Sequence, residues 1–597
     1  MSEYTAPLRD IRFVLEHLAD LEAVSALPGF EHVDADGVFS VLEENARFLE
    51  DLVAPLNRVG DVQGSVRNED GSVTTPDGFK EAYKAYVDAG WNGVAFPSEY
   101  GGGGFPWLVG IAMQEILTSA NMAFSMCPLL NQGAVDMLLH HASEELRETY
   151  LPKMVTGEWT GTMNLTEPQA GSDVGALTTK AVPNDDGTYR ITGTKIYISF
   201  GEHDMSENII HLVLARTPSA PPGTKGISCF IVPKLLVGDD GSLGDRNDVT
   251  CVSIEHKMGI KASPTCVLSY GDRGEGAVGY LIGEENAGMR YMFTMMNNAR
   301  LSVGLEGLAV AERACQMAIA YANERQQGRA PGAAAGHQSF IVEHPDVRRM
   351  LLTQRASIEA LRGVIYANAA AIDRAARHPD DATRSASGEL ADFLTPVSKG
   401  WGTDLGVELT SLALQVFGGM GYIEETGVAQ HVRDARIAPI YEGTNGIQAM
   451  DLVGRKLPMR AGAAVAHYLG QIDATVAELA DAGEELASIR EGLVDGLAAL
   501  RTATDWLLAK GSSEPLDALA GATPYLRLFS VVTGGWVMAQ QALKATALLA
   551  AASSADQAFY DAKIVTARFY CEQLLPQAAG LVPAVTATNR DLAAAVF

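Results

Sequence analysis

The chain has 597 residues, a length that predicts several domains rather than one hydrophobic core. Hydrophobic residues make up 47% and charged residues 20%, as in globular proteins, and the net charge of −28 disfavours nucleic acid or an anionic membrane as the main partner. No apolar run approaches the roughly 18 residues that span a bilayer, which argues against membrane insertion.

Hydrophobic periodicity divides the chain into five segments. Residues 1–36 form an amphipathic leader without the apolar stretch of a secretory signal, so the expected location is cytoplasmic. Helical patterns continue through a first helical domain at 37–160. Short β-branched runs between Gly, Pro and Asp predict a β domain at 161–284. Helical patterns return at 285–456 and again at 457–597, which is rich in Ala and Leu. This order lacks the alternating βαβ units of a doubly wound nucleotide fold.

The six cysteines are scattered, with no C-x-x-C and no histidine at metal-ligand spacing. We therefore predict reduced core thiols, without a metal site or a disulfide framework. The cysteines are Cys127, Cys229, Cys251, Cys266, Cys315 and Cys571.

The stretch MNLTEPQAGSDVGAL, at 163–177, lies where helices give way to strands. Its hydroxyls, Thr166 and Ser172 among them, and its backbone amides suit a heteroaromatic ring with many acceptors. Composition alone favours the alternative, a turn in which Ser172 and Asp173 bind local amides.

The run KIYISFGEHD, at 195–204, ends a predicted strand. Strand alternation predicts that Tyr197 and Ser199 point to the same face, where they can flank a flat cofactor. Core packing plus one satisfied hydroxyl is the alternative.

A predicted helix at 305–329 ends in Arg325, Gln327 and Arg329. Arginine can bind a pyrophosphate with two parallel hydrogen bonds. A solvated helix end explains the pattern about equally well.

The next signal is QVFGGMGYIEETG, at 415–427. Gln415 precedes Gly418 and Gly419, whose bare backbone permits a ligand to approach closely. The segment resembles a dinucleotide fingerprint, but Glu424 stands where the third glycine belongs, so a Rossmann-type site is not expected.

In PIYEGTNGIQ, at 439–448, Glu442 stands alone between the apolar Ile440 and the flexible Gly443. A surface loop explains this placement, and so does a catalytic base in a dry pocket.

Three of these motifs decide between the alternatives. In this order and within an α-β-α context, LTEPQAGSD, QVFGGMGY and YEGTNGIQ resemble the acyl-CoA dehydrogenase family over residues 40–456. The N-terminal YTAPLRDIRFVLEHL and the tail beyond residue 460 resemble an enlarged bacterial subgroup that includes the 3-methylmercaptopropionyl-CoA dehydrogenases. The resemblance implies an α+β fold with an N-terminal helical domain, a middle β-barrel domain, a C-terminal four-helix bundle and an additional helical domain.

The resemblance also implies FAD, bound between the β domain and the second helical domain and partly at a subunit interface. The residues matched to the cofactor are Thr166, Tyr197, Ser199, Arg325, Gln415, Gly419 and Thr444. Thr166, Ser199 and Thr444 correspond to contacts with the flavin ring. Tyr197 corresponds to a stacking residue that is more often tryptophan. Arg325 corresponds to a pyrophosphate ligand from the partner subunit, with Gln415 and Gly419 along the adenosine.

On the substrate side, the resemblance matches Glu442 to the base that removes the α-proton of an acyl-CoA thioester. Some relatives carry the base just before the position of Arg300, but here that residue is Ala299. Arg300 corresponds to a residue near the substrate, and Ser172 to one that meets the pantetheine arm. Gly443 lets the backbone approach the thioester. The β-hydrogen leaves as hydride to flavin N5, and burial of the base brings its pKa closer to what proton abstraction requires.

The electron acceptor implied is an electron-transfer flavoprotein, with an oxidase that uses oxygen as the alternative. A DNA-associated flavoprotein of the same family is a second alternative, but residues 461–597 carry 8 Lys and Arg against 14 Asp and Glu, a poor surface for duplex binding. The acyl group is either 3-methylmercaptopropionyl or a medium- or long-chain fatty acyl, and we expect a homodimer. No side-chain contact is assigned to Asn445.

Overall fold

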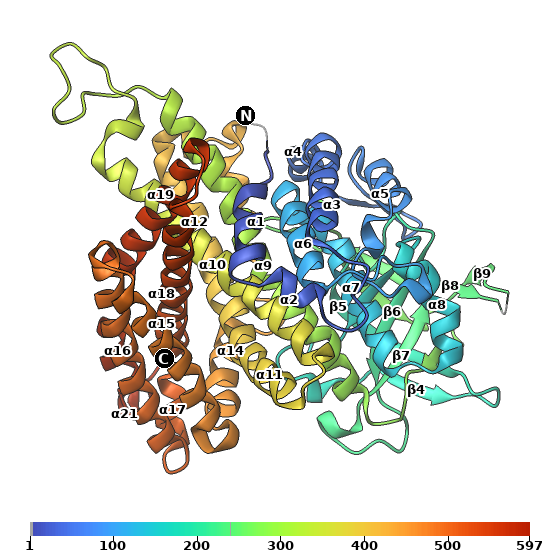
Figure 1. The fold of residues 1–597 in the computed structure, drawn as a ribbon. Coiled ribbons are helices and arrows are strands. Elements are labelled where there is room, and N and C mark those ends of the chain that lie inside the picture. The colour runs from blue at the N-terminus through green and yellow to red at the C-terminus, as the bar shows by residue number, and fades with distance from the viewer. Residues whose placement is uncertain (1–3, 239) are drawn as a thin grey trace. The chain divides into compact units, whose positions relative to one another are not determined.

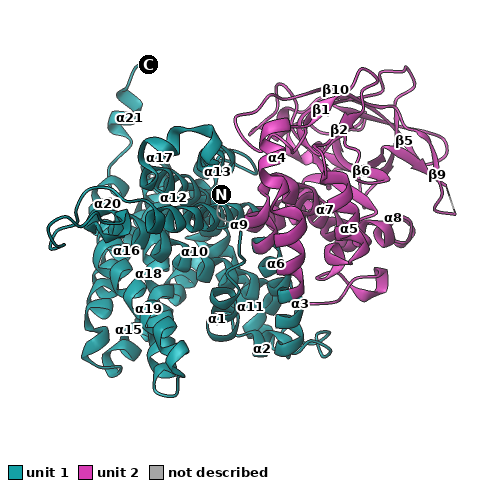
Figure 2. Ribbon diagram, turned by 90° about the horizontal axis from the view of Figure 1, so that it is seen from above, with its two compact units in different colours: residues 1–43, 106–115, 303–597 teal, residues 44–105, 116–302 magenta. Residues whose placement is uncertain are grey.

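The computed structural model describes residues 4–238 and 240–597, and the chain divides into two compact units (Figures 1 and 2). Unit 1 consists of residues 1–43, 106–115 and 303–597, and unit 2 consists of residues 44–105 and 116–302. Each unit therefore joins stretches that are distant in sequence. The five predicted segments stay a prediction about domain boundaries.

Unit 2 begins with helices that are capped by their own sequence. In α7, the side chain of Asn121 accepts a hydrogen bond from the Phe124 N–H at 3.1 Å. In α8, Ser143 caps the start and Gly157, at φ +92°, ends the helix. The helices that lie wholly in this part are η1 (Leu49–Val53), α4 (Leu56–Gln63), α5 (Phe79–Asp88), η2 (Trp91–Gly93), η3 (Ser98–Tyr100), α7 (Met122–His141) and α8 (Glu144–Thr156). Helices α3 (Ala35–Phe48) and α6 (Trp107–Ala120) each begin in unit 1 and end in unit 2.

A small hairpin interrupts this helical part and corrects the prediction that it is helical apart from loops. Strands β1 (Val66–Arg67) and β2 (Val73–Thr74) pair antiparallel around a turn that ends at Gly71, φ +86°. The Arg67 Nε donates a hydrogen bond to the Cys251 carbonyl at 2.8 Å. Strands of two residues are too short to show a period of two, so the sequence pattern did not reveal them.

The β part of unit 2 is an eight-stranded sheet in the order β10-β11-β5-β12-β7-β6-β3, with β4 paired to β5. The pairings are antiparallel except for β3 with β6. Strands β8 and β9 form a separate pair. The strands are β3 (Trp159–Asn164), β4 (Lys180–Pro183), β5 (Tyr189–Ser199), β6 (Asn208–Ala215), β7 (Ser228–Pro233), β8 (Leu235–Val237), β9 (Leu243–Arg246), β10 (Val249–Ile254), β11 (Thr265–Tyr270) and β12 (Ala277–Leu281), with short helical turns η4 (Val174–Ala176) and η5 (Thr224–Gly226) between them.

Unit 1 is helical, and the first long helix, α9, continues into it from unit 2. Its helices before residue 457 are α1 (Leu8–His17), α2 (Leu21–Ser25), α9 (Gly288–Glu324), η6 (Ile341–Glu343), α10 (Pro345–Arg377), α11 (Asp381–Pro396), η7 (Val397–Trp401), α12 (Gly402–Val416), η8 (Gly418–Tyr422), η9 (Glu424–Thr426), α13 (Val428–Ala435), α14 (Asn445–Asp451) and η10 (Leu452–Lys456). After it come η11 (Met459–Gly462), α15 (Ala463–Asp481), η12 (Glu484–Leu486), α16 (Ala487–Gly511), α17 (Pro515–Ala520), α18 (Ala522–Leu549), α19 (Ser554–Phe569), η13 (Tyr570–Leu574), α20 (Gln577–Val585) and α21 (Arg590–Ala594).

The predicted end of the helix at Arg329 is wrong. Helix α9 ends at Glu324, and Arg325 already lies outside it. The chain then turns back on itself, because the Gln327 N–H donates to the Ser339 carbonyl at 3.0 Å and Gly328 has φ +66°. This pairing with a segment twelve residues away outweighs the local helical pattern.

Helices α1 and α19, which are more than 500 residues apart in sequence, pack together within unit 1. Helix α1 buries Ile11, and its Phe13 ring meets the Phe559 ring of α19 edge to face at 5.8 Å. On the outer side of this contact, Arg9 forms an ion pair with Asp556 at 2.7 Å. The leader is therefore an integral helix of unit 1.

Helix α18 joins the second helical bundle to the first. The Gln541 Nε2 donates to the Glu359 carbonyl on α10 at 3.2 Å. A Cβ on Gly363 of α10 would lie 2.2 Å from Val537 Cγ1 of α18, so the two helices approach more closely than a side chain at Gly363 permits. The last 140 residues thus share a core with the preceding helices.

Among the helices of residues 4–238 and 240–597, none is both long enough and apolar enough to span a membrane. All six cysteines are free and buried. In the same described residues, no group of His, Cys, Asp and Glu is arranged to hold a metal ion.

Candidate active site

The loop that carries Glu442 has a strained backbone. Glu442 has φ +56° and the following Gly443 has φ +80°, so two successive residues adopt the left-handed conformation. For glutamate this conformation costs about 1–2 kcal/mol, and such strain persists only where the surrounding structure enforces it. The Glu442 side chain is half-buried, and helix α14 begins three residues later.

Asn445 is the main anchor of this loop. Its Nδ2 donates to the Gly400 carbonyl at 2.9 Å and to Asp404 Oδ1 at 2.7 Å, and its Oδ1 accepts from Lys399 Nζ at 2.9 Å. The side chain therefore fixes the start of α14 to the junction of η7 and α12. Sequence reasoning missed this role, because an Asn-Gly pair looks like a flexible turn.

Two further contacts complete the support of the loop. The Gln448 Nε2 donates to the Gly443 carbonyl at 3.2 Å. Thr444 is the N-cap of α14, with its side chain accepting from the Ile447 N–H at 3.4 Å. Both contacts come from the start of α14, so the helix itself holds the loop in place.

The turn beneath the loop, η7, is π-helical. Its Lys399 is fully buried, and a Cβ on Gly400 would lie 2.6 Å from Leu526 Cδ2 of α18. Single π-helical turns inside helices are frequent at functional sites. Helix α18 of the second bundle therefore packs directly against the turn that anchors Asn445.

A second carboxyl lies beside the base. Glu306 of α9 is 1% exposed, and its Oε2 accepts a hydrogen bond from the Tyr441 hydroxyl. Burial raises the pKa of Glu306 to about 8; the hydrogen bond from Tyr441 opposes this rise, and the negative charge of Glu442 adds to it. Burial and the nearby Glu306 also raise the pKa of the Tyr441 phenol, so it keeps its proton and donates.

In unit 2, strand β5 brings Thr166 close to Tyr197. The Ile196 N–H donates to the Thr166 carbonyl at 2.9 Å. At this point the pairing of β5 with β11 shifts register, and Tyr197 has φ +61° with 62% of its surface exposed. A β-bulge between Lys195 and Ile198 therefore interrupts the alternation of β5 at Tyr197, and the shared face of Tyr197 and Ser199 stays a prediction.

Glu167 and Lys195 hold the loop at 163–177 onto the sheet. The Lys195 Nζ donates to Glu167 Oε1 at 2.8 Å and to the Leu165 carbonyl at 2.9 Å, and both side chains are buried. Glu167 also accepts hydrogen bonds from the N–H and hydroxyl of Thr178 and of Thr179. Burial raises the pKa of Glu167, but the Lys195 ammonium and these hydrogen bonds bring it down to about 2.

This anchoring leaves the predicted ligand groups of the loop open. The turn is closed by Glu167 rather than by Ser172, which is exposed. Within the described residues, the hydroxyls of Thr166, Ser172 and Ser199 make no hydrogen bond. Sequence reasoning missed Glu167 and Lys195, because a buried ion pair across 28 residues leaves no local pattern.

Arg300 lies on the part of α9 that belongs to unit 2. It is buried, and its Nη1 donates to Asn297 Oδ1 at 3.3 Å. Ala299 beside it is buried as well, so the position that carries the base in some relatives holds a methyl group here.

Arg325, Gln415 and Gly419 gather at another end of unit 1. The rings of Tyr321 and Phe417 stack at 4.3 Å and join the last turns of α9 and α12. Gln415 is eleven residues along α12 from Asp404, which anchors the base loop, a distance of about 16 Å at 1.5 Å per residue. The length of α12 thus separates Gln415 from the anchor of the base loop.

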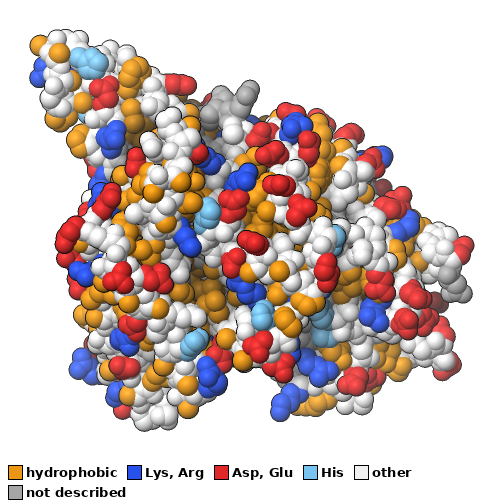
Figure 3. Space-filling view, viewed as in Figure 1, with side chains coloured by type: hydrophobic (Ala, Val, Ile, Leu, Met, Phe, Trp, Pro, Cys, Tyr) orange, Lys and Arg blue, Asp and Glu red, His pale blue; other side chains and the backbone are white. Residues whose placement is uncertain are grey.

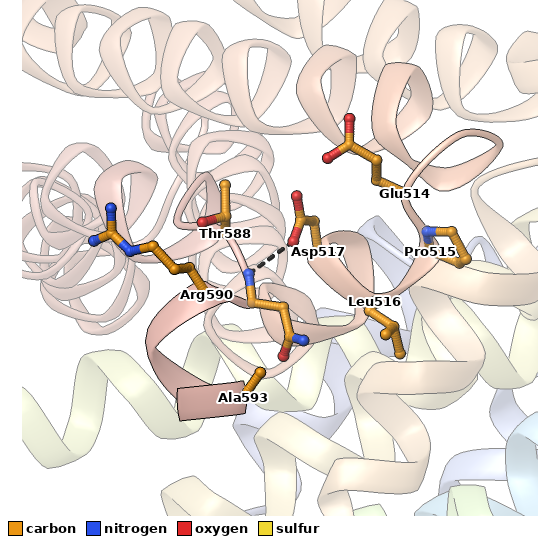
Figure 4. A pocket seen from close by; sticks show the side chains of 8 residues that line it. Glu514, Pro515, Leu516, Asp517, Thr588, Arg590 and Ala593 are labelled. Atoms are coloured by element: carbon orange, nitrogen blue, oxygen red, sulfur yellow. Dashed lines mark hydrogen bonds between the residues drawn. The ribbon is translucent and has the colours of Figure 1, made fainter. Parts of the chain in front are cut away.

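A surface hollow of about 570 Å³ lies at the tip of the second bundle (Figure 4). It is lined by α17, α21 and the segment before α21, and the Asn589 N–H donates to Asp517 Oδ1 at 2.7 Å across it. None of the predicted site residues lines this hollow.

Family models match along most of the chain. The acyl-CoA dehydrogenase N-terminal, middle and C-terminal domain models match residues 41–158, 162–272 and 286–457, and an acetyl-CoA dehydrogenase C-terminal like model matches residues 468–595. The chain is 47% identical to 3-methylmercaptopropionyl-CoA dehydrogenase of Ruegeria pomeroyi, over 99% of both chains. This chain belongs to the acyl-CoA dehydrogenase family.

Two other relatives agree with this assignment. The broad-specificity linear acyl-CoA dehydrogenase FadE5 of Mycobacterium tuberculosis is 35% identical over 96% of both chains. A solved acyl-CoA dehydrogenase of Bacillus anthracis, complexed with FAD, shares the fold with a TM-score of 0.74 and 20% identity, over 94% of this chain and 90% of that one. Like its family, this acyl-CoA dehydrogenase is an FAD-dependent oxidoreductase that acts on acyl-CoA. The predicted family and fold class are confirmed.

Proposed function

We propose that Glu442 of this acyl-CoA dehydrogenase removes the α-proton of an acyl-CoA thioester in forming the trans-2-enoyl-CoA. The observation that carries the proposal is the left-handed backbone at Glu442, held by Asn445 and Gln448. A protein retains such strain where a side chain must be aimed at one point, and a base must align with the bond it breaks.

The loop supplies what α-proton removal requires. A carbanion next to a thioester needs a base on the proton and a donor on the carbonyl oxygen. Glu442 is the base, and its own backbone N–H is the donor, with Gly443 allowing the thioester to come close. FAD, when bound, accepts the β-hydrogen as a hydride.

The free polar groups of the chain fit the FAD that the family requires. Thr166 and Ser199 have unbonded hydroxyls beside the exposed ring of Tyr197, which suits a flat ring with several acceptors. We assign Ser172, exposed on the same loop, to the pantetheine arm of CoA, and Arg300 to the substrate.

The remaining cofactor residues support a homodimer. The Arg325 guanidinium is exposed and forms no ion pair within the described residues, as a pyrophosphate ligand requires. A Cβ on Gly419 would meet open space, so nothing in its own chain requires glycine there. Gln415 lies about 16 Å along α12 from the anchor of the base loop, and Arg325 and Gly419 follow the stacked rings of Tyr321 and Phe417, so we infer that the three residues serve the FAD of a partner subunit.

The substrate we favour is 3-methylmercaptopropionyl-CoA, because the relative of that name is 47% identical over nearly the whole chain. The second candidate is a linear fatty acyl-CoA, favoured by the broad-specificity relative of similar length. The acceptor we propose is an electron-transfer flavoprotein. DNA binding is disfavoured, since on the face in Figure 3 lysine and arginine are interspersed with aspartate and glutamate.

An anaerobic titration tests the base and the substrate together. The purified protein is mixed with 3-methylmercaptopropionyl-, butanoyl-, octanoyl- or palmitoyl-CoA, and absorbance is followed at the long-wavelength flavin band. We expect bleaching by at least one thioester and its loss in Glu442→Gln, which keeps the shape of the side chain. Bleaching that survives in Glu442→Gln would contradict the assignment of the base.

Three further measurements separate the remaining alternatives. Oxygen uptake with peroxide release during turnover would identify an oxidase and contradict the proposed acceptor. A retarded band in a DNA gel shift would favour the DNA-associated alternative. A mass other than that of a dimer in light scattering would contradict the homodimer.

A further inference from the structure

Glu306 is buried, but its carboxyl lacks the full set of hydrogen bonds that a structural carboxyl makes. It is 1% exposed, and its Oε1 has no hydrogen-bond partner within the described residues. A buried carboxyl oxygen without a partner costs about 1–3 kcal/mol. Such a group therefore requires an explanation in terms of strain or function.

Another buried acid of unit 1 shows what a structural carboxyl looks like. Glu115 is fully buried and bonds through Oε1 to Arg362 Nε at 2.9 Å and through Oε2 to the Tyr366 hydroxyl at 2.8 Å. Both of its oxygens are satisfied and its charge is balanced by arginine. Glu306 likewise accepts a hydrogen bond from a tyrosine, Tyr441. Among the described residues, however, no cation is bonded to it.

The groups that face Glu306 come from two elements. The base loop contributes Tyr441 and Glu442, and η7 contributes Lys399. The pKa of Glu306 stands at about 8, mainly through burial. Near neutral pH its carboxyl therefore holds a proton. Two neighbouring carboxylates do not both ionise readily, so a neutral Glu306 is compatible with the carboxylate that a base at Glu442 requires.

We propose that Glu306 is a positioning residue for the base: its neutral carboxyl, bonded to the Tyr441 hydroxyl, fixes the loop at Glu442 and keeps a second negative charge away from it. This inference rests on the proposed function of Glu442. The hydrogen bond reaches the residue directly before the base, so it orients the peptide that carries the left-handed conformation.

The two carboxyls are then coupled. Above about pH 8, Glu306 loses its proton and places a negative charge beside the base. We expect the rate of anaerobic flavin reduction to show an inflection near pH 8.

Two variants and one control test the inference. Glu306→Gln keeps the shape and the bond to Tyr441 but cannot ionise, so the inflection near pH 8 should disappear. Tyr441→Phe removes the hydrogen bond that lowers the pKa of Glu306, so the inflection should move to higher pH. Glu312→Gln, six residues further along α9 and paired with Arg362 at 2.9 Å, should leave the inflection in place. Profiles of both variants that coincide with the wild type would overturn the inference.

Infrared spectroscopy of the protein without substrate tests directly whether the Glu306 carboxyl is protonated. Near neutral pH, the wild type should show a protonated-carboxyl absorption that is missing from Glu306→Gln and kept in Glu312→Gln. Identical spectra of wild type and Glu306→Gln would overturn the inference even if thioesters bleach the flavin. Failure of every thioester to bleach would instead contradict the proposed function and leave the infrared result intact. If Glu306→Gln does not fold, Tyr441→Phe tests the inference alone. A shift of its inflection to higher pH would support the inference, and an unchanged inflection would overturn it.

Discussion

At the residue scale, the geometry of the base depends on side chains that carry no chemistry themselves. The side chain of Asn445 bonds to four residues of η7 and α12, and Glu306 accepts a hydrogen bond from Tyr441 at the other end of the loop. The left-handed backbone of Glu442 lies between these attachments. The strain of about 1–2 kcal/mol is thus enforced from both sides of the loop.

Asn445→Ala tests the first attachment. We expect flavin reduction to slow about tenfold or more, because the base is no longer aligned, and the free energy of unfolding to fall by about 1–3 kcal/mol through unpaired buried groups. Single-turnover kinetics and denaturant unfolding measure the two effects. The control is Asn323→Ala, whose side chain bonds only to the Ile319 carbonyl on an exposed helix surface. An unchanged reduction rate in Asn445→Ala would contradict the positioning role.

Gly443→Ala tests the backbone itself. At φ +80° a Cβ costs about 1–2 kcal/mol, so we expect a loss of stability of that size together with slower flavin reduction. Gly446→Ala is the matched control, since its added Cβ would meet only Thr444 Oγ1 at 3.7 Å. Equal effects of the two substitutions in thermal unfolding would argue against strain at Gly443.

At the element scale, the loop at 163–177 depends on a strand that follows it in sequence. Lys195 of β5 and Glu167 of the loop form a buried ion pair, and Glu167 gathers the amides of Thr178 and Thr179. Next to Lys195, the β-bulge turns Tyr197 outward. The same strand therefore anchors the loop and presents the ring that we assign to the flavin.

Glu167→Gln should destabilise this arrangement by about 3–5 kcal/mol, since it leaves Lys195 buried without its counter-charge. The pKa of Glu167 is about 2 when folded, below its ordinary value of about 4.5, so its contribution is complete above about pH 4.5 and is lost as the pH falls toward 2. Denaturant unfolding across this range should show a fall with decreasing pH that is steeper in the wild type than in Glu167→Gln. Parallel curves would contradict the low pKa.

At the scale of the whole molecule, the second helical bundle completes unit 1. Its helix α18 packs Leu526 against Gly400 beneath the base loop and Val537 against Gly363 of α10. The Thr566 hydroxyl of α19 donates to Glu359 Oε2 at 2.7 Å. The bundle thus supports the turn η7, to which Asn445 is bonded.

A chain that ends at residue 457 should therefore not fold as a smaller acyl-CoA dehydrogenase. Its α10 face would expose an apolar surface and leave buried charges unpaired, which costs more than the few kcal/mol of net stability of a domain. Circular dichroism and bound flavin measure the outcome. The control lacks only residues 590–597, which hold the five-residue helix α21 and an exposed tail, and should stay folded. A native spectrum with full flavin content in the long truncation would contradict this dependence.

The order of helical and β segments could be predicted from sequence, because the periods of 3.6 and 2 are local properties that each segment carries by itself. The motifs around Thr166, Gln415 and Glu442 were sufficient to recognise the family for the same reason: each is a contiguous run in which the residue types alone are informative. The α9 boundary and the hairpin at 66–74 were not predictable in this way. Both depend on pairing with another part of the chain.

The sequence by itself determined the family, the fold class and the loop that carries Glu442. Only the tertiary structure decided that the loop is strained, that Asn445 and Glu306 hold it, and that a β-bulge exposes Tyr197. The physical reason is the range of the interactions. Helical and strand patterns arise within a few residues, whereas Glu306 and Tyr441 are 135 positions apart and meet only once the helices have packed.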